Sequence, residues 1–293
     1  MGSIKHTYFH MLNKIIAKLK KREFVGADAL RTMKRFRREE TAKYAERLFP
    51  RLYDAKASVR LEAIKALGLM RPHMRPHMRP HVLAKYVPNI VARLDDDEVE
   101  DVRFQAIEAL RTLEPEVLTR YAQDIIPGLD DDVEDVRYEA IKALGRLFPE
   151  VLTGYAQDII PRLDDESEFV RYEAIKALGK LEPEMQTKYA QDIIPRLDDD
   201  EQCVRIEAIK ALGKLEPEML TKYAQDIIPR LDDDEEWVRS QAIEALGKLE
   251  PQMLARYAHK IIPRLGDNDA CVRIKALKAL SKLRKCSQDT PSK

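Results

Sequence analysis

From Tyr223 to Leu249 the chain reads YAQDIIPRLDDDEEWVRSQAIEALGKL, which is one copy of a unit that fills most of the 293 residues. Its opening block, YAQDIIP, recurs every 34 residues, at Tyr121, Tyr155, Tyr189 and Tyr223, and in altered form at Tyr44, Tyr86 and Tyr257. A fixed period of this length is typical of stacked units that share one continuous core. We therefore expect a single elongated domain over residues 44–285.

Each repeat predicts two helices and no strand. The first, called the A helix, begins at Pro217, because proline suits a first helical turn, and Pro229 predicts a kink or a tightened last turn. The second, called the B helix, contains Val238 and buries one apolar side. The acidic residues between the helices can cap the N-terminus of the B helix. The expected fold class is all-α, an α-α superhelix of about seven repeats.

An arginine follows the valine of every B helix. On the helical wheel Arg239 falls at the flank of the apolar side, where a guanidinium needs an ionic partner because an unpaired buried charge costs several kcal/mol. The acidic loop is the natural partner. We predict an arginine–carboxylate ladder through the stack, formed by Arg60, Arg103, Arg137, Arg171, Arg205, Arg239 and Arg273.

These recurring letters resemble a known family. The pattern Leu-x-Asp-Asp, then Val-Arg-x-x-Ala-x-x-Ala-Leu-Gly, then the proline of the next A helix, looks like HEAT repeats, specifically the short HEAT-like type named after phycobilisome lyases. The resemblance covers residues 44–285 in about seven copies, with residues 1–43 as a degenerate capping repeat. It implies a right-handed superhelix whose B helices line the concave face, and relatives that mostly bind other macromolecules.

The letters that change between copies are the candidate binding positions. They lie just before the valine of the B helix and two residues after it, on the stripe of the helix opposite the core. Large apolar residues on an exposed face indicate an interface, whereas the alternative is that they fold between repeats and widen the core. The predicted partner-binding residues are Leu61, Phe104, Tyr138, Phe169, Tyr172, Cys203, Ile206, Trp237, Ser240, Gln241 and Ile274. We expect them to be flanked by Glu139, Glu173, Glu207 and by Lys142, Lys176, Lys210 and Lys248.

This pattern predicts a non-enzymatic scaffold that binds another protein, as a helix or an extended peptide, on the concave face. We expect no catalytic residue, metal site or cofactor. No histidine precedes glutamate as in HEAT-like iron hydroxylases, and the acidic loops lack the glycine and terminal glutamate of an EF-hand. Two alternatives stay open: a bilin-lyase-like transferase or accessory factor, and nucleic-acid binding through the basic N-terminal cap at Lys20-Lys21-Arg22.

The N-terminal segment is basic. Residues 1–47 contain 13 Lys and Arg against 5 Asp and Glu, although the whole chain has 51 of each. We interpret residues 1–43 as a capping repeat; an organellar transit peptide and a membrane-surface helix are the alternatives. A single-sign nucleic-acid groove along the repeats is disfavoured by their mixed charges.

Two further segments depart from the repeat. Residues 70–81 copy the phrase Met-Arg-Pro-His, and their prolines predict an inserted extended loop rather than a helix. A soft-metal site formed by His73, His77 and His81 is the alternative there. Residues 286–293 are expected to be a disordered tail.

The cysteines and the hydropathy of the sequence indicate the cellular compartment in which the protein is expected. Cys203, Cys271 and Cys286 show no paired spacing, which favours a reducing, intracellular and cytoplasmic environment. No stretch approaches the roughly 20 apolar residues of a membrane span. We expect a monomer or a weak dimer.

Overall fold

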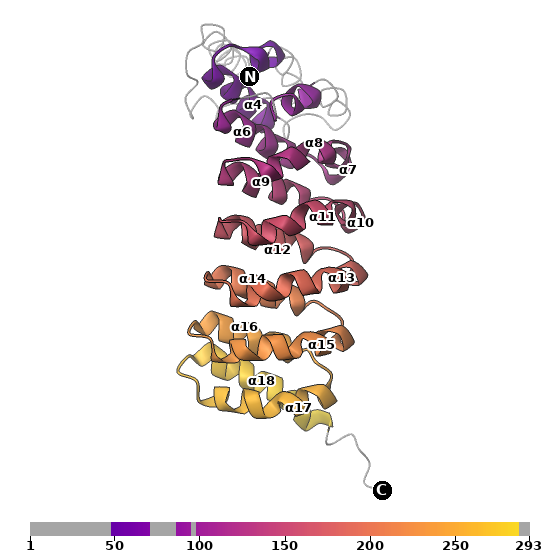
Figure 1. Ribbon diagram of the computed structural model, residues 1–293, viewed down its shortest axis with the longest axis vertical. Helices are drawn as coiled ribbons and strands as arrows, with labels where there is room; N and C mark the ends of the chain where they lie inside the picture. Colours follow the sequence, from indigo (N-terminus) through magenta and orange to yellow (C-terminus); the bar gives the residue numbers. More distant parts are fainter. Residues whose placement is uncertain (1–47, 71–85, 95–97, 287–293) are drawn as a thin grey trace, which may run out of the picture. The chain divides into compact units, whose positions relative to one another are not determined.

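The computed structural model describes residues 48–70, 86–94 and 98–286, and these form helices and turns without a strand (Figure 1). The chain divides into two compact units, one ending at Leu147 and the other beginning at Phe148. The division falls between two repeats, and the predicted all-α class is confirmed. The expected capping repeat over 1–43, the histidine-containing insertion and residues 287–293 of the expected tail lie outside the described residues.

The first unit contains short A-helix segments and longer B helices. Its described elements are η1 (Phe49–Tyr53), α4 (Ala57–Met70), α6 (Glu100–Arg111), α7 (Pro115–Leu118), η3 (Thr119–Tyr121), α8 (Ala122–Ile125), η4 (Ile126–Asp130) and α9 (Glu134–Leu144). The B helices α4, α6 and α9 follow one another, and α6 packs against both of the others.

The second unit repeats the helix pair in a regular series, visible in Figure 1 from α10 to α18. Its A-helix elements are α10 (Pro149–Leu152), η5 (Thr153–Tyr155), α11 (Ala156–Ile159), η6 (Ile160–Asp164), α13 (Pro183–Ile193), η7 (Ile194–Asp198), α15 (Pro217–Ile227), η8 (Ile228–Asp232), α17 (Pro251–Ile261) and η9 (Ile262–Gly266). Its B helices are α12 (Glu168–Leu178), α14 (Gln202–Leu212), α16 (Glu236–Leu246) and α18 (Ala270–Cys286). Each B helix packs against the next.

Prolines set both ends of the A helices. Pro217 occupies the first turn of α15, and the α-helix gives way to the 3-10 helix η8 at Ile228, directly before Pro229. Proline has no N–H for the i−4 bond of a continuing α-helix, so the last turn tightens as the sequence predicts. The chain then turns into the acidic loop, and the B helix begins.

The B helices carry the core. In α14 the valine, the two alanines of the repeated motif and their apolar neighbours are buried, with Val204, Ala208, Ile209, Ala211 and Leu212 all between 0% and 4% exposed. Burial of each large aliphatic side chain stabilises the fold by roughly 1.5–3 kcal/mol. The letters that repeat along the chain are therefore the letters of the core.

Close approach of neighbouring B helices explains the glycine that follows α12, α14 and α16. A Cβ atom placed on Gly213, directly after α14, would lie 3.1 Å from Cβ of Ala245 in α16. Gly213 has a φ of −69°, which any residue adopts, so the glycine is needed for space and not for an unusual backbone conformation.

Among the described residues, the aspartates of the acidic loops cap a B helix in one place, before α18, where Asp269 Oδ1 accepts a hydrogen bond from the N–H of Val272 at 3.0 Å; the loop before α14 differs. Asp199 Oδ1 accepts a hydrogen bond from the backbone N–H of Glu201 at 3.1 Å, while Glu201, the N-cap of α14, makes no side-chain capping bond. The aspartate lies three residues before the helix, too early to reach its first free N–H groups. It closes a turn in the loop instead, and the prediction that it caps the B helix was wrong at this position.

Candidate functional site

The start of each B helix places a variable side chain just before the buried valine. In the second unit two of these side chains are large and exposed: 58% for Phe169 at the start of α12 and 59% for Trp237 at the start of α16. Cys203, at the same position of α14 between them, is half-buried, and burial raises the pKa of its thiol. Phe169 and Trp237 thus lie on equivalent positions two repeats apart, about 16–20 Å at usual helix spacing.

The other predicted partner-binding residues are less uniform. Half-buried side chains are those of Leu61, Phe104, Tyr138, Tyr172, Ile206 and Gln241. Ile274 is 64% exposed, whereas Ser240 is buried at 8%. The expectation that Ser240 faces solvent was therefore wrong. Tyr172 and Ile206 occupy the equivalent position in other repeats and are long enough to remain half-exposed, whereas the shorter serine side chain is covered.

The half-buried tyrosines are covered by lysines of the next helical turn. Lys142 Nζ lies 4.8 Å from the ring centre of Tyr138, and Lys176 Nζ lies 5.5 Å from that of Tyr172. Both distances suit a cation–π contact. Burial, with the nearby carboxylate of Glu207, raises the pKa of Tyr172.

The glutamates expected to flank these residues at the surface are instead buried. Glu139 and Glu173 are each 2% exposed and Glu207 is 6% exposed. Glu173 binds Lys176 at 2.9 Å within its own helix, and Glu139 accepts a hydrogen bond from Arg111 of the preceding B helix. A neighbouring B helix covers their position, so these carboxylates are buried between repeats. The lysines that were expected beside them remain at the surface.

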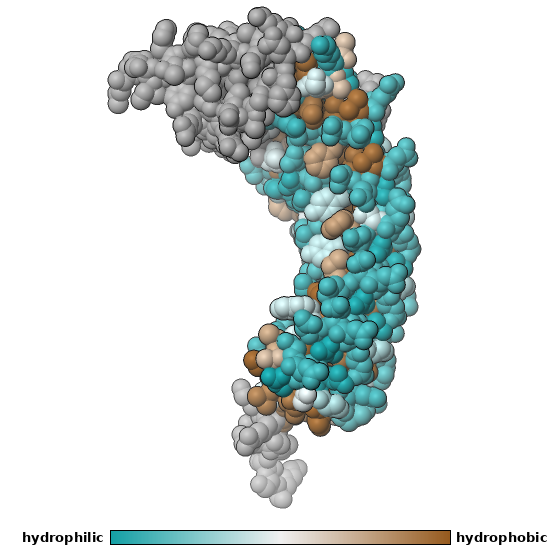
Figure 2. All heavy atoms as spheres, turned by 90° about the vertical axis from the view of Figure 1, so that its left-hand side faces the viewer, coloured by the Kyte–Doolittle hydropathy of each residue, from teal (hydrophilic) through white to brown (hydrophobic). Residues whose placement is uncertain are grey.

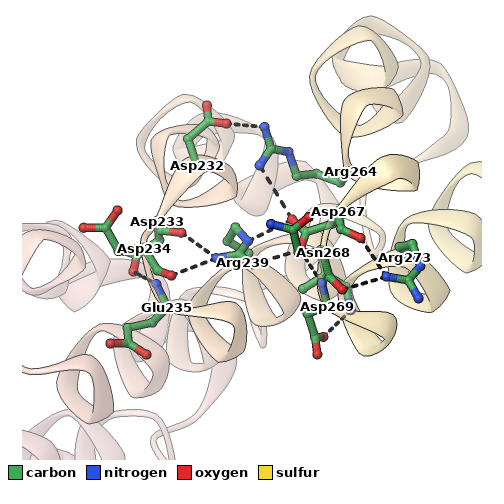
Figure 3. A network of polar contacts seen from close by, with 11 residues as sticks. Asp232, Asp233, Asp234, Glu235, Arg239, Arg264, Asp267, Asn268, Asp269 and Arg273 are labelled. Carbon is green, nitrogen blue, oxygen red and sulfur yellow. Dashed lines mark hydrogen bonds and ion pairs between the residues drawn. The ribbon is translucent and has the colours of Figure 1, made fainter.

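The arginines after the valines connect successive acidic loops, as Figure 3 shows for Arg239. Its Nη1 donates to the backbone carbonyls of Asp233 and Asp234, both at 2.9 Å. Its Nε and Nη2 donate to the two carboxylate oxygens of Asp267 in the next repeat, at 2.9 and 2.8 Å. One guanidinium therefore stabilises its own loop and the following one.

The same arrangement recurs along the chain. The further carboxylate pairs within each unit are Arg103–Asp131, Arg171–Asp199 and Arg205–Asp233. Arg60, Arg137 and Arg273 donate Nη1 to two carbonyls of their own loops. The hydrogen bond from Arg239 holds the pKa of Asp267 below its ordinary value, although burial opposes this.

A second arginine set, which the sequence analysis did not single out, completes the network. Arg264, at the end of the A helix, binds Asp232 of the preceding loop at 2.6 Å and lies 3.7 Å from Asp267 (Figure 3). Arg230 and Arg196 do the same one and two repeats earlier. The recurring Pro-Arg-Leu-Asp sequence was the available signal. The acidic loops are thus largely neutralised within the fold.

The last helix pair exposes apolar side chains that the sequence analysis missed. They are Ile262 and Leu265 of η9 and Leu277 of α18. Leu277 occupies the position of Ile243, which is fully buried, and no described helix follows α18 to cover it. Figure 2 shows one face on which hydrophilic side chains predominate over the second unit, with scattered apolar spots and an apolar group near its C-terminal end.

The described residues contain no group of three or more His, Cys, Asp or Glu placed to bind a metal ion. Among the same residues no helix combines the length and the apolar character required to cross a bilayer. The candidate site consists of the exposed apolar side chains and the surface lysines described above.

Comparison with known proteins identifies the repeat. The family model of HEAT repeats matches residues 45–145 and 122–213. No curated protein matches the chain.

Solved structures share the fold. An engineered protein is similar with a TM-score of 0.60 at 16% identity, over 87% of this chain and 73% of that one. A designed armadillo repeat protein in complex with the peptide (KR)4 is similar with a TM-score of 0.55 at 19% identity, over 67% of this chain and 99% of that one. A second designed armadillo repeat protein is similar with a TM-score of 0.53 at 20% identity, over 67% and 99%. The HEAT model matches more than half of the sequence, and this chain belongs to the HEAT-repeat family.

Proposed function

We propose that this chain is a non-enzymatic scaffold that binds another protein on the face formed by the B helices of its second unit. The observation that carries the proposal is the exposure of Phe169 and Trp237, at 58% and 59%, on equivalent positions of α12 and α16. Large aromatic side chains on a helical surface are frequent anchors of protein interfaces. The repeat-solenoid fold is typical of such scaffolds.

Contrast within the repeat supports this assignment. The core positions and the arginine–aspartate pairs recur almost unchanged, so they account for folding. Phe169 and Trp237 belong to the few positions that differ between copies, and neither is needed to fill the core. The structurally similar designed armadillo repeat protein in complex with (KR)4 supports the idea that a surface of this kind can bind a peptide.

The rigidity of the second unit suits this role. The arginine pairs connect each repeat to the next, so the spacing between Phe169 and Trp237 is set before a partner arrives. Preorganisation of this kind reduces the entropy lost on binding.

Affinity capture from a lysate of the source cells tests the proposal. The bait proteins are the wild type, the double variant Phe169→Ser/Trp237→Ser, and the control Phe148→Ser/Ile262→Ser, whose residues are exposed at 41% and 53% outside the B helices. We expect at least one protein to be retained by the wild type and the control and lost from the B-helix variant. Identical sets of captured proteins for all three baits would contradict the proposal.

A further inference from the structure

A row of lysines lies near the C-terminal ends of the B helices in the second unit. Lys214 Nζ donates to the carbonyl of Gly179 at 2.9 Å, and Lys248 Nζ donates to that of Gly213 at 2.8 Å. Lys282 donates in the same way to Gly247. Each lysine thus binds the end of the preceding B helix, where free carbonyls and the helix dipole favour a cation.

These hydrogen bonds position the ammonium groups without neutralising them. A carbonyl oxygen carries no net charge, and an ammonium group keeps two further donors after making one bond. In the described part of the chain no carboxylate lies within ion-pair distance of Lys214, Lys248 or Lys282, and all three are exposed. The lysine edge therefore differs from the opposite edge of the same helices, where arginines pair with the acidic loops.

A pocket of about 200 Å³ lies on this lysine edge, between α16 and α18. Its apolar lining comes from Ile243 and Ala279, and its charged lining consists of Glu244, Lys248, Lys275, Lys278 and Lys282. A hydrogen bond from Lys275, with Lys248 and Lys278 nearby, lowers the pKa of Glu244. The pocket is thus a place where a carboxylate is stabilised.

One helix, α16, has both features: Trp237 is exposed at its start, and Lys248 is exposed two residues after its end. Trp237 and Lys248 are eleven residues apart; α16 ends at Leu246, and continuing its helical wheel for two more residues gives a difference of about 20° in direction and about 16 Å in height. The glutamates that could neutralise this side, Glu173 and Glu207, are buried in the packing between repeats. The exposed side therefore has an apolar edge and a cationic edge.

We infer that the partner presents an acidic amphipathic helix to this surface, with apolar side chains toward Trp237 and carboxylates toward Lys248, Lys278 and Lys282. An α-helix with side chains is about 10–12 Å wide and fits between edges about 16 Å apart. Crossing α14, α16 and α18 takes about 14 residues, given helix spacings near 10 Å. A nucleic acid fits less well, because the exposed carboxylates of Asp200 and Asp234 at the other end of these helices, which pair with no described arginine, would repel its phosphates.

This inference rests on the proposed function and refines its partner. Because Trp237 is the only tryptophan, its fluorescence reports binding at the surface directly. The full chain is titrated with a stapled 14-residue helix that has leucines on one side and glutamates beside them. Parallel titrations use the same peptide with every glutamate replaced by glutamine or by lysine, and a 14-nucleotide single-stranded DNA, each at low and moderate salt.

We expect the acidic peptide to bind at least about ten-fold more tightly than the neutral one. Lys278→Glu should weaken it by about two- to five-fold, the size expected for one exposed ion pair. Lys222→Glu, an equal charge change at an exposed residue of the A helix α15, should leave its affinity unchanged. Lys278 suits the test because it is exposed and its side chain makes no hydrogen bond or ion pair with a described residue.

Three results would overturn the inference. Tighter binding of the lysine peptide, strengthened by Lys278→Glu, would assign a basic partner to the same surface and leave the scaffold function standing. Tighter binding of the DNA, falling steeply with salt, would assign a nucleic acid. No change in Trp237 fluorescence with any peptide up to millimolar concentration would show that the partner is not an acidic helix. The capture experiment would still test the scaffold function independently.

Discussion

Arg205 donates from Nε and Nη2 to the two carboxylate oxygens of Asp233 in the next repeat, and both distances are 3.0 Å. The two side chains are 12% and 5% exposed. Nη1 of the same guanidinium donates to the carbonyls of Asp199 and Asp200, at 2.7 and 2.9 Å. A largely buried arginine thus joins two acidic loops, and its removal leaves the carboxylate of Asp233 with only the longer arginine contact, to Arg230 at 3.6 Å.

We expect Arg205→Ala to lower the free energy of unfolding of the second unit by about 3 kcal/mol, the usual cost of removing one partner from a buried ion pair. Urea unfolding followed by Trp237 fluorescence measures it. Arg273→Ala is the matched control, because Arg273 is exposed and donates only to the carbonyls of Asp267 and Asn268. Equal effects of the two substitutions would show that the pairing with Asp233 contributes nothing.

The pair of Arg239 and Asp267 predicts a specific response to acid. Its hydrogen bond lowers the pKa of Asp267 in the folded state, so the pair stabilises the fold fully above the unfolded value of about 3.9 and loses this contribution as pH falls below it. Thermal unfolding of the wild type and Arg239→Gln, followed by circular dichroism from pH 6 to pH 2, checks this. The difference in Tm should shrink below about pH 4; a constant difference would contradict it.

Glu62 is buried at 3% in the first unit, and its Oε2 has no hydrogen-bond partner among the described residues. Burial raises its pKa, although Lys65 opposes this, so the carboxylate destabilises the fold increasingly as pH rises above the unfolded value of about 4.3. We expect Glu62→Gln to stabilise the protein by about 1 kcal/mol at pH 7 in urea unfolding, and less at pH 4.

Glu139→Gln is the matched control for that substitution. Glu139 is equally buried but accepts hydrogen bonds from Arg111 and Lys142, so its neutralisation should destabilise the first unit. If both substitutions destabilise to the same extent, the unpaired state of Glu62 is not the source of the effect.

Gly213 has a close neighbour in the next helix and Gly154 has none, so substitutions at the two positions test whether a glycine is required for space. Gly213→Ala places a methyl group 3.1 Å from Cβ of Ala245 and should lower stability by about 1–3 kcal/mol through overpacking. At Gly154 no atom lies within 4 Å of the added Cβ, so Gly154→Ala should be neutral or stabilise by about 0.5 kcal/mol. Differential scanning calorimetry compares them. A larger loss of stability for Gly154→Ala would contradict the packing argument.

The helix pairs, the core and the tightened end of each A helix could be predicted from the sequence. Val204, Ala208 and Leu212 repeat at helical spacing, and Pro229 lacks a donor wherever it is placed. These features depend on local chemistry that the repetition displays several times over. The exposure of Phe169 and Trp237 follows from the same helical periodicity.

Features that depend on contact between neighbouring repeats were harder to predict. Glu207 lies on the outer side of its own helix but is buried close to Tyr172 of the preceding B helix, and Ser240 is too small to reach solvent. The hydrogen bond from Lys248 to Gly213 joins residues 35 apart, and helical periodicity within one repeat gives no sign of it. A helical wheel describes a single helix, whereas the burial of these side chains depends on two neighbouring helices.

Site-specific photo-cross-linking tests most directly whether the B helices hold the partner. Trp237 is replaced by p-benzoylphenylalanine, which keeps a large aromatic side chain at the surface, and Gln225, exposed on the A helix α15, is replaced likewise as the control. The variants are irradiated with the protein retained by the capture experiment. We predict a cross-linked product from position 237 and none from position 225; a product from position 225 alone would contradict the central claim.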